Sequence, residues 1–174
     1  MNKILLHICC GICSGWPIEK LRQDGYEVTG IFYNPNIHPR DEYERRLEAA
    51  KKACFVRGME LISAPYDCER WLSLTEDLKN EPEGGKRCSL CYRLRLEYTA
   101  LKAKEMGIEY FTTTLSISPH KDSALINRIG IEIAGDGFKE YDFKKADGFK
   151  KSNRFSLEHG LYRQNYCGCS YNMR

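Results

Sequence analysis

Residues 3–25, KILLHICCGICSGWPIEKLRQDG, decide the fold predicted for this chain of 174 residues. Residues 3–9 form a nearly continuous apolar run of strand length, which is typical of a strand buried on both faces of a parallel sheet. Residues 15–25 then read as a helix that ends at Gly25. A buried strand followed directly by a helix predicts the beginning of a βαβ arrangement.

The same alternation of apolar runs and helical patterns continues to the end of the chain. Further strands are predicted at 26–35, 59–66, 108–116 and 139–145, and further helices at 39–58, 68–78, 88–107, 122–135 and near 156–164. This order predicts an α/β fold with a doubly wound, Rossmann-like, mostly parallel sheet of about five strands and helices on both faces. Neither repeats nor a linker interrupt the pattern, so residues 1–174 are interpreted as a single α/β domain.

The composition predicts a protein of the cytoplasm that does not associate with membranes. We find no apolar run of about 18 residues and no leader with a cleavage site, and the apolar stretch near the beginning is too short for a secretory core. A cytoplasmic location predicts reduced thiols. We also expect a monomer.

Seven of the nine cysteines fall in three tight groups. The groups are CCGIC (Cys9, Cys10 and Cys13), CSLC (Cys88 and Cys91) and CGC (Cys167 and Cys169), whereas Cys54 and Cys68 stand alone. Nine thiols cannot all pair, and their share of the chain is below the ~8–10% that marks a disulfide-rich secreted domain. Clustered thiols in a reducing compartment instead predict metal ligands or redox-active groups.

The predicted topology brings these groups together. Sites in parallel α/β sheets form outside the carboxyl ends of the strands, where CCGIC and residues 114–122 (TLSISPHKD) are expected. Cys88 and Cys91 are three residues apart, so both project from one side of a first helical turn, whose N-terminus favours thiolates. Cys9 and Cys10 can reach one metal only if the chain turns after them, which Gly11 permits.

The spacing of the thiols leaves their chemistry open. Four thiolates from the first two groups suit either zinc or a [4Fe–4S] cluster, and adjacent ligands favour the cluster because structural zinc sites commonly use C-x2-4-C on both arms. Cys167 and Cys169 could ligate a second metal, with Cys13 or a carboxylate, or cycle between dithiol and disulfide. They could also be two small apolar side chains packed in a tail.

The last part of the chain is basic and aromatic. From Lys139 onward there are eight Lys or Arg residues and four acidic ones, interleaved with seven Phe or Tyr residues. Such a mixture suits a phosphate backbone and unstacked bases. A solvated surface with a few packed rings accounts for the composition equally well.

Five blocks of the sequence resemble, in order, the signature blocks of the QueH epoxyqueuosine reductases. They are HICCGIC (7–13), NPNIHPRDEYERR (34–46), EPEGGKRCSLCYRLRLEYTA (81–100), FTTTLSISPHKD (111–122) and LYRQNYCGCSY (161–171). Together the blocks span nearly the whole chain and are highly specific. One departure is that the family often has CCAPC where this chain has Gly11 and Ile12 in the middle, so only the local turn geometry differs.

The resemblance implies an oxidoreductase that reduces epoxyqueuosine to queuosine at the wobble position of tRNA, the last step in making this base, without cobalamin. It implies that Cys9, Cys10, Cys88 and Cys91 ligate a [4Fe–4S] cluster. It also implies that Cys167 and Cys169 are a redox-active pair or ligands of an adjacent metal, for which a second iron is the candidate; Cys13 is a further candidate ligand from its position alone.

The reaction that the resemblance implies consumes two electrons and two protons, because the epoxide oxygen leaves as water. An external electron donor is therefore expected, together with a general acid for the departing oxygen. Since a cluster ordinarily passes one electron at a time, a second store of electrons is useful, and the Cys167 and Cys169 pair or an iron beside the cluster could be that store. The candidates for the acid are Asp142, Asp67, His120 and Tyr166; Asp142, Cys167 and Cys169 form the predicted catalytic set.

The expected substrate is a base splayed out of an anticodon loop. Residues next to CGC would stack on and hydrogen-bond this base, and lysines and arginines before them would hold phosphates. The predicted tRNA-binding residues are Lys144, Lys145, Lys150, Lys151, Arg154, Tyr162, Arg163, Gln164 and Tyr166.

Two other functions compete with this hypothesis. A tRNA-thiolating ATPase with an iron–sulfur cluster would need a phosphate-binding loop after the first strand, where this chain has CCGICSG. A zinc-stabilised tRNA-binding protein without catalytic activity would contain zinc rather than iron.

Overall fold

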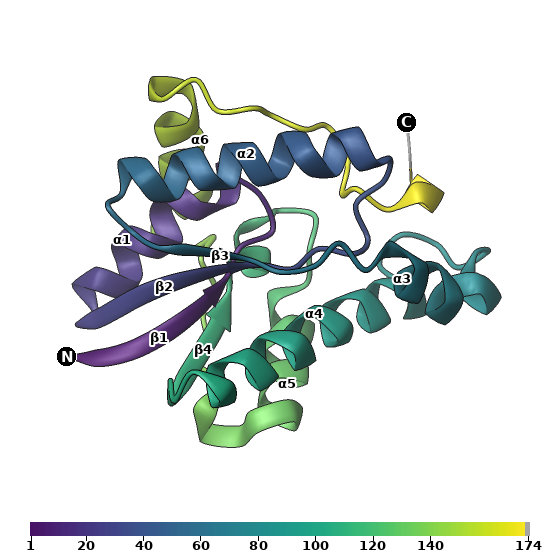
Figure 1. The fold of residues 1–174 in the computed structure, drawn as a ribbon, viewed down its shortest axis with the longest axis horizontal. Helices are drawn as coiled ribbons and strands as arrows, with labels where there is room; N and C mark the ends of the chain where they lie inside the picture. Colours follow the sequence, from purple (N-terminus) through teal and green to yellow (C-terminus); the bar gives the residue numbers. More distant parts are fainter. Residues whose placement is uncertain (173–174) are drawn as a thin grey trace.

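The computed structural model describes residues 1–172, and its centre is a four-stranded parallel sheet (Figure 1). The strands run in the order β3-β2-β1-β4, with bounds β1 (Asn2–His7), β2 (Tyr26–Phe32), β3 (Leu61–Ser63) and β4 (Tyr110–Thr113). Strand β1 lies between β2 and β4 and is buried on both faces, which explains its continuous apolar run.

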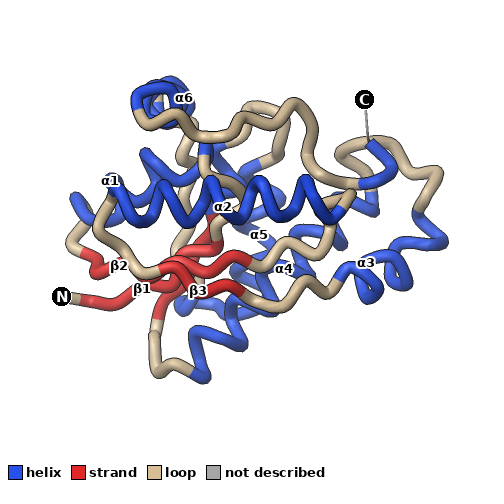
Figure 2. The backbone as a smooth tube through the Cα atoms, turned by 45° about the horizontal axis from the view of Figure 1, so that its top comes forward, coloured by secondary structure: helices blue, strands red, loops and turns tan. Residues whose placement is uncertain are grey.

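Helices cover both faces of the sheet (Figures 1 and 2). The α-helices are α1 (Gly15–Gln23), α2 (Arg40–Val56), α3 (Cys68–Thr75), α4 (Lys86–Glu105), α5 (Ser123–Ala134) and α6 (Gly148–Glu158). Short 3-10 turns are η1 (Ile12–Ser14), η2 (Glu76–Leu78), η3 (Thr114–Ile117), η4 (Gly135–Gly137) and η5 (Ser170–Asn172). Helices α1, α2 and α6 lie on one face and α4 and α5 on the other, while α3 lies beyond the end of the strands.

The side chains of β1 show how this sheet is stabilised. Ile4 and Leu6 pack into one hydrophobic core with α1 and α2, whereas Leu5 packs into a second core with Leu96 of α4 and Ile126 of α5. This alternation along one strand builds two cores on opposite faces. The predicted doubly wound α/β fold is therefore confirmed.

The predicted number of strands was one too high. Residues 139–145 do not form a fifth strand, and a single parallel bridge joins Phe111 to Phe138. Beyond this bridge the rings of Tyr141 and Phe143 stack on each other, with centroids 4.7 Å apart. The alternating pattern that predicted a strand thus reflects two stacked rings, the second of which begins the turn before α6.

The last helix also begins earlier than predicted, at Gly148 instead of near 156. Its buried face consists of Gly148, Ser152, Phe155 and Ser156, so three of its four buried residues are small. Helix α6 lies so close to α1 that a Cβ atom on Gly148 would be 2.4 Å from the side chain of Trp16. The same atom would be 1.8 Å from the carbonyl oxygen of Phe143, in the turn before α6. A face of small residues lacks the apolar period that predicts a helix.

Within the described part of the chain, none of the helices combines the length and the apolar character that a membrane span requires.

Candidate active site

The candidate site lies at the carboxyl edge of the sheet, between β1 and β4. From β1 the chain continues to β2 and β3 on one side of the sheet, and β4 is then added on the other side of β1. Ligands bind at such points, where the order of the strands reverses. Cys9 and Thr114 join the two strand ends, since the Cys9 amide donates to Thr114 Oγ1 (3.1 Å) and Thr114 Oγ1 donates to Cys9 Sγ (3.3 Å). A cavity of about 530 Å³ opens there, within the ~300–1,000 Å³ of small-molecule sites.

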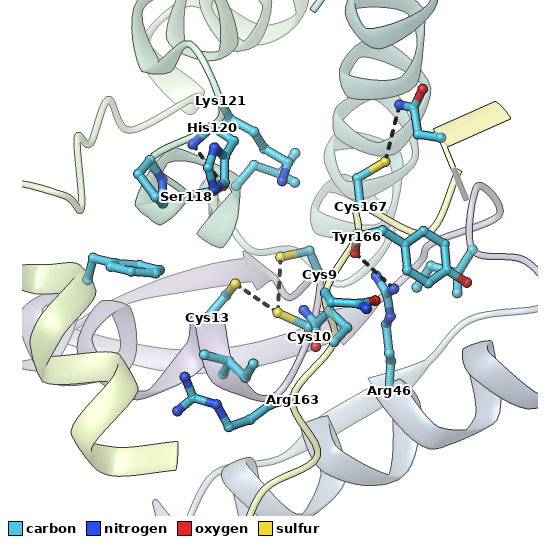
Figure 3. Close-up of a pocket in the computed structure, with 18 of the residues that line it drawn as sticks. Cys9, Cys10, Cys13, Arg46, Ser118, His120, Lys121, Arg163, Tyr166 and Cys167 are labelled. Atoms are coloured by element: carbon cyan, nitrogen blue, oxygen red, sulfur yellow. Dashed lines mark hydrogen bonds between the residues drawn. The ribbon is translucent and has the colours of Figure 1, made fainter. Parts of the chain in front are cut away.

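Three thiols form the floor of this cavity (Figure 3). The Sγ atom of Cys10 lies 3.7 Å from that of Cys9 and 2.7 Å from that of Cys13, and all three lie within 4.8 Å of one another. They converge because Cys9 and Cys10 lie in the short segment after β1, and the following turn η1 brings Cys13 back to Cys10. Their spacing is suitable for holding a metal ion.

Gly11 is needed in this turn for a different reason from the one predicted. Its backbone is ordinary right-handed helix, with φ of −64°, so a permissive conformation is not required. Instead, a Cβ atom at this position would lie 2.7 Å from the carbonyl oxygen of Ala49 in α2. Glycine therefore allows the thiol-bearing turn to pack directly on α2.

The other four clustered thiols line a second, smaller cavity of about 30 Å³. Cys88 and Cys91 come from the first turns of α4, and Cys167 and Cys169 from the segment after α6. Cys88 Sγ accepts a hydrogen bond from the Gly84 amide (3.2 Å). Cys167 lines both cavities, so the three groups of thiols meet although they are far apart in sequence.

A buried ion pair holds the C-terminal segment at this edge. Arg46 and Glu42 of α2 are each 2% exposed and are joined by a bond of 2.7 Å between Arg46 Nε and Glu42 Oε1. Arg46 also donates to the carbonyl of Tyr166 (3.0 Å), and the hydroxyl of Tyr162 donates to Glu42 (2.7 Å). The segment before CGC is thereby held at Tyr162 and at Tyr166.

Gly168 lets the chain turn between the two thiols of CGC. Its φ is +101°, a conformation that L side chains rarely adopt, and its carbonyl accepts a hydrogen bond from the His38 amide (2.8 Å). A Cβ atom there would also lie 2.9 Å from Ile37. The glycine of CGC is thus required both for the turn and for close contact with the loop after β2.

One thiol of each of two groups is inclined to ionise. Hydrogen bonds from Cys10 and Cys13 hold the pKa of Cys9 well below its usual value, whereas burial raises the pKa of Cys10 to about 12. The hydrogen bond from Cys169 lowers the pKa of Cys167 to about 5. Thiolates are the form that binds metals and reacts, so Cys9 and Cys167 present reactive sulfur to the large cavity.

Two cations face the thiols. Lys121 acts electrostatically on Cys9, Cys91 and Cys167, which is one thiol from each group. Burial lowers the pKa of Arg95, but Cys91 and Cys9 outweigh this effect and hold that pKa above its usual value. Both cations line both cavities, so the thiols sit in a positively charged environment.

The predicted substrate-binding residues are divided between the cavity and the surface. Arg163, Gln164 and Tyr166 line the large cavity, whereas Tyr162 lies outside it. Lys144 donates to the backbone carbonyls of Ser116 and Lys121, so it fixes the loop after β4. The remaining predicted residues flank or lie on α6, and they are Lys145, Lys150, Lys151 and Arg154.

The candidate acids occupy different positions. His120 lines both cavities and Tyr166 lines the larger one, where its hydroxyl donates to the carbonyl of His38. Asp142 forms an ion pair with Lys144 (3.3 Å), and neither Asp142 nor Asp67 lines either cavity.

Sequence reasoning missed Arg95, Lys121 and the anchoring pair Glu42 and Arg46. Arg95 had a signal, because it lies four residues after Cys91 and seven after Cys88, on the same face of one helix. Lys121 directly follows the candidate acid His120. The pair Glu42 and Arg46 reads as an ordinary i, i+4 surface pair, and only the path of the C-terminal segment buries it.

Comparisons with known proteins give one consistent family. The sequence model of the family described as epoxyqueuosine reductase QueH matches residues 4–174. The epoxyqueuosine reductase QueH of Streptococcus pyogenes serotype M1 is 40% identical, over 97% of this chain and 69% of its own length. The QueH proteins of Acinetobacter baylyi and Thermotoga maritima are each 37% identical, over 99% of this chain and 81% and 91% of their own lengths. The chain therefore belongs to the QueH epoxyqueuosine reductase family.

Proposed function

We propose that this chain reduces epoxyqueuosine to queuosine in tRNA, and that it does so at the large cavity beside Cys9, Cys10, Cys13 and Cys167. The observation that carries the proposal is that thiols from three distant segments line two adjoining cavities, with Cys167 in both. The reaction converts an epoxide, two electrons and two protons into an alkene and water. A cavity lined with thiols and cations can supply both electrons and protons.

We propose an iron–sulfur cofactor, because the donor set fits one. Soft thiolates select iron–sulfur clusters, zinc or copper(I), and zinc has no redox chemistry to offer a reduction. Cys9, Cys10, Cys88 and Cys91 would hold a [4Fe–4S] cluster, and Arg95 interacts with Cys9 and Cys91, one from each pair. When bound, such a cluster supplies electrons one at a time.

The remaining thiols would be a second store of electrons beside the cluster. Oxidation of the Cys167 and Cys169 thiols to a disulfide releases two electrons and two protons, the amounts that removal of the epoxide oxygen consumes. Both thiols line the smaller cavity and each shifts the pKa of the other, which supports their pairing. An external electron donor would then restore the dithiol. Alternatively, Cys13, Cys167 and Cys169 would hold a second iron beside the cluster.

His120 is the acid that the cavity favours. It lines both cavities beside Lys121, so its imidazole can give a proton to an oxygen that leaves the substrate there. Asp142 would act indirectly, because its partner Lys144 donates to the carbonyl of Lys121. Replacing His120 with glutamine should lower kcat about 100-fold or more, the usual contribution of a general acid.

The mouth of the large cavity would hold the anticodon base. Phe149 is 36% exposed and lines the cavity, so it offers a ring for stacking, and Arg163 offers a cation for the neighbouring phosphates. Lys150 and Arg154 of α6 are 84% and 74% exposed in their side chains and extend this positive surface. A cytoplasmic location and a monomeric state belong to the same proposal.

The test is nucleoside analysis of tRNA containing epoxyqueuosine after incubation with anaerobically purified protein and a reductant. Cys167→Ser should abolish queuosine formation while the protein keeps its iron absorbance. Cys68→Ser is the matched control, because Cys68 is half-buried and lines neither cavity, and it should retain activity. Full activity in Cys167→Ser would exclude both roles proposed for this thiol.

A further inference from the structure

Arg95 is a buried arginine in the wall between the two cavities. Its residue is 4% exposed, and it lines both cavities. Its Nη2 donates to Cys91 Sγ (3.1 Å), and its Nε donates to the backbone carbonyl of Cys91 (3.2 Å). The guanidinium is thus held against one thiol of the α4 group by two of its nitrogens.

A buried polar network fixes the third nitrogen. Arg95 Nη1 donates to Asn34 Oδ1 (3.4 Å), and Asn34 Nδ2 in turn donates to the carbonyl of Ile8 at the end of β1 (2.9 Å). His7 Nε2 faces two acceptors, the carbonyl of Tyr33 (3.0 Å) and Asn34 Oδ1 (3.2 Å), so this nitrogen carries the proton. The network keeps the guanidinium in one orientation beside Cys91.

Among the described residues, the hydrogen-bond partners of Arg95 are a thiol, a backbone carbonyl and a side-chain amide oxygen, and none of them is a carboxylate. The ionisable groups that act most strongly on it are Cys91, Cys9, Tyr92 and Cys167, and a carboxylate is not among these four. A guanidinium remains charged in proteins, and burying it is costly unless an anion compensates it. Arg95 donates to Cys91 Sγ and lines both thiol cavities, so thiolates that ligate a metal there would compensate its charge.

We propose that Arg95 is a positioning residue that acts as the counter-charge of this thiol site and raises the reduction potential of the iron–sulfur centre held there. The inference rests on the proposed function, since it requires that centre. Each added electron makes the centre more negative, so a fixed positive charge at its side stabilises the reduced form. Arg95 does not need to touch the substrate for this role.

The experiment is a redox titration of anaerobically purified protein, followed by electron paramagnetic resonance. At a fixed potential, Arg95→Gln should lower the ratio of reduced to oxidised centre about tenfold, which is 59 mV for a one-electron couple. Arg95→Lys keeps the charge and should recover at least half of this shift. Arg93→Gln on the same helix is the control, because Arg93 is 38% exposed and pairs with Glu132, and it should leave the potential unchanged.

Five outcomes decide the matter. An Arg95→Gln variant with full iron content and the wild-type potential would overturn the proposal, as would equal shifts in Arg95→Gln and Arg95→Lys. If Arg95→Gln lost its iron, retention of iron by Arg95→Lys would support the role of charge, and loss in both would refute it. Absence of iron and sulfide from the wild type would overturn the proposed function as well, whereas the other outcomes leave that function standing.

Discussion

Replacing Glu42 with glutamine should loosen the segment that carries Cys167 and Cys169. The Glu42 carboxylate accepts hydrogen bonds from Arg46, Arg45 and Tyr162 at 2.7, 2.9 and 2.7 Å. Arg46 in turn holds the carbonyl of Tyr166, immediately before Cys167. The variant keeps the shape of the side chain but leaves the buried Arg46 without its counter-charge.

The expected loss is about 3 kcal/mol of unfolding free energy. Removing one partner of a buried ion pair costs about 3–5 kcal/mol, and glutamine retains one oxygen acceptor, which places the loss near the lower end. Domains of this size are stable by about 5–15 kcal/mol, so the variant should still fold. Glu44→Gln is the matched control, because Glu44 pairs with Arg40 on the surface of the same helix, and its loss should be about 0.5 kcal/mol or less.

The assay is urea unfolding combined with hydrogen exchange. With a slope of about 1–3 kcal/mol per molar urea, the midpoint of Glu42→Gln should fall by about 1–3 M. Exchange should accelerate at the amide of His38, which is bonded to the carbonyl of Gly168. A midpoint and an exchange rate equal to those of Glu44→Gln would refute the role assigned to the buried pair.

The difference between wild type and Glu42→Gln should also depend on pH. Burial raises the pKa of Glu42, but the hydrogen bonds from Tyr162 and Arg46 outweigh it and hold the pKa below its usual value. A carboxyl whose pKa is lower in the folded state stabilises the fold above its unfolded pKa of about 4.3. The stability difference should therefore be full at neutral pH and shrink as the pH falls through the lower, folded pKa.

Three further predictions concern the site. Gly168→Ala should cost about 1–2 kcal/mol, because alanine is strained at a φ of +101°, and calorimetry together with nucleoside analysis should show reduced stability and activity; an unchanged melting temperature would contradict this. Gly11→Ala should lower iron content, measured by metal analysis, since its Cβ would collide with Ala49. Binding of tRNA should weaken steeply between 50 and 200 mM salt in a filter-binding assay if the α6 lysines hold phosphates, and a flat response would contradict their role.

The strands were predictable where apolar residues fill a buried position in the sheet. The apolar run of residues 3–9 matches a central strand, and the alternation with helices predicted the doubly wound sheet. The prediction failed at residues 139–145 and at the beginning of α6. There the structure depends on stacked rings and on a buried face with glycine and two serines, which local hydrophobicity does not register.

The candidate site was predictable as far as its sulfur atoms. Clustering of the cysteines and the position of strand ends predicted that the groups would meet, and Cys167 does line both cavities. The charges around them were not predictable from spacing alone. Glu42 and Arg46 are buried by a segment about 120 residues away in sequence, and Lys121 faces thiols from every group.

The most direct test is to count iron and acid-labile sulfide in anaerobically purified wild type, Cys9→Ser and Cys88→Ser. If sulfur from separate segments ligates one [4Fe–4S] cluster, the wild type should hold at least about four irons and four sulfides per chain. Cys9 follows β1 and Cys88 lies on α4, so the two proposed ligands come from separate segments. Loss of either ligand should therefore remove the cluster. A colourless wild type that contains zinc, or a full cluster in either variant, would contradict the account.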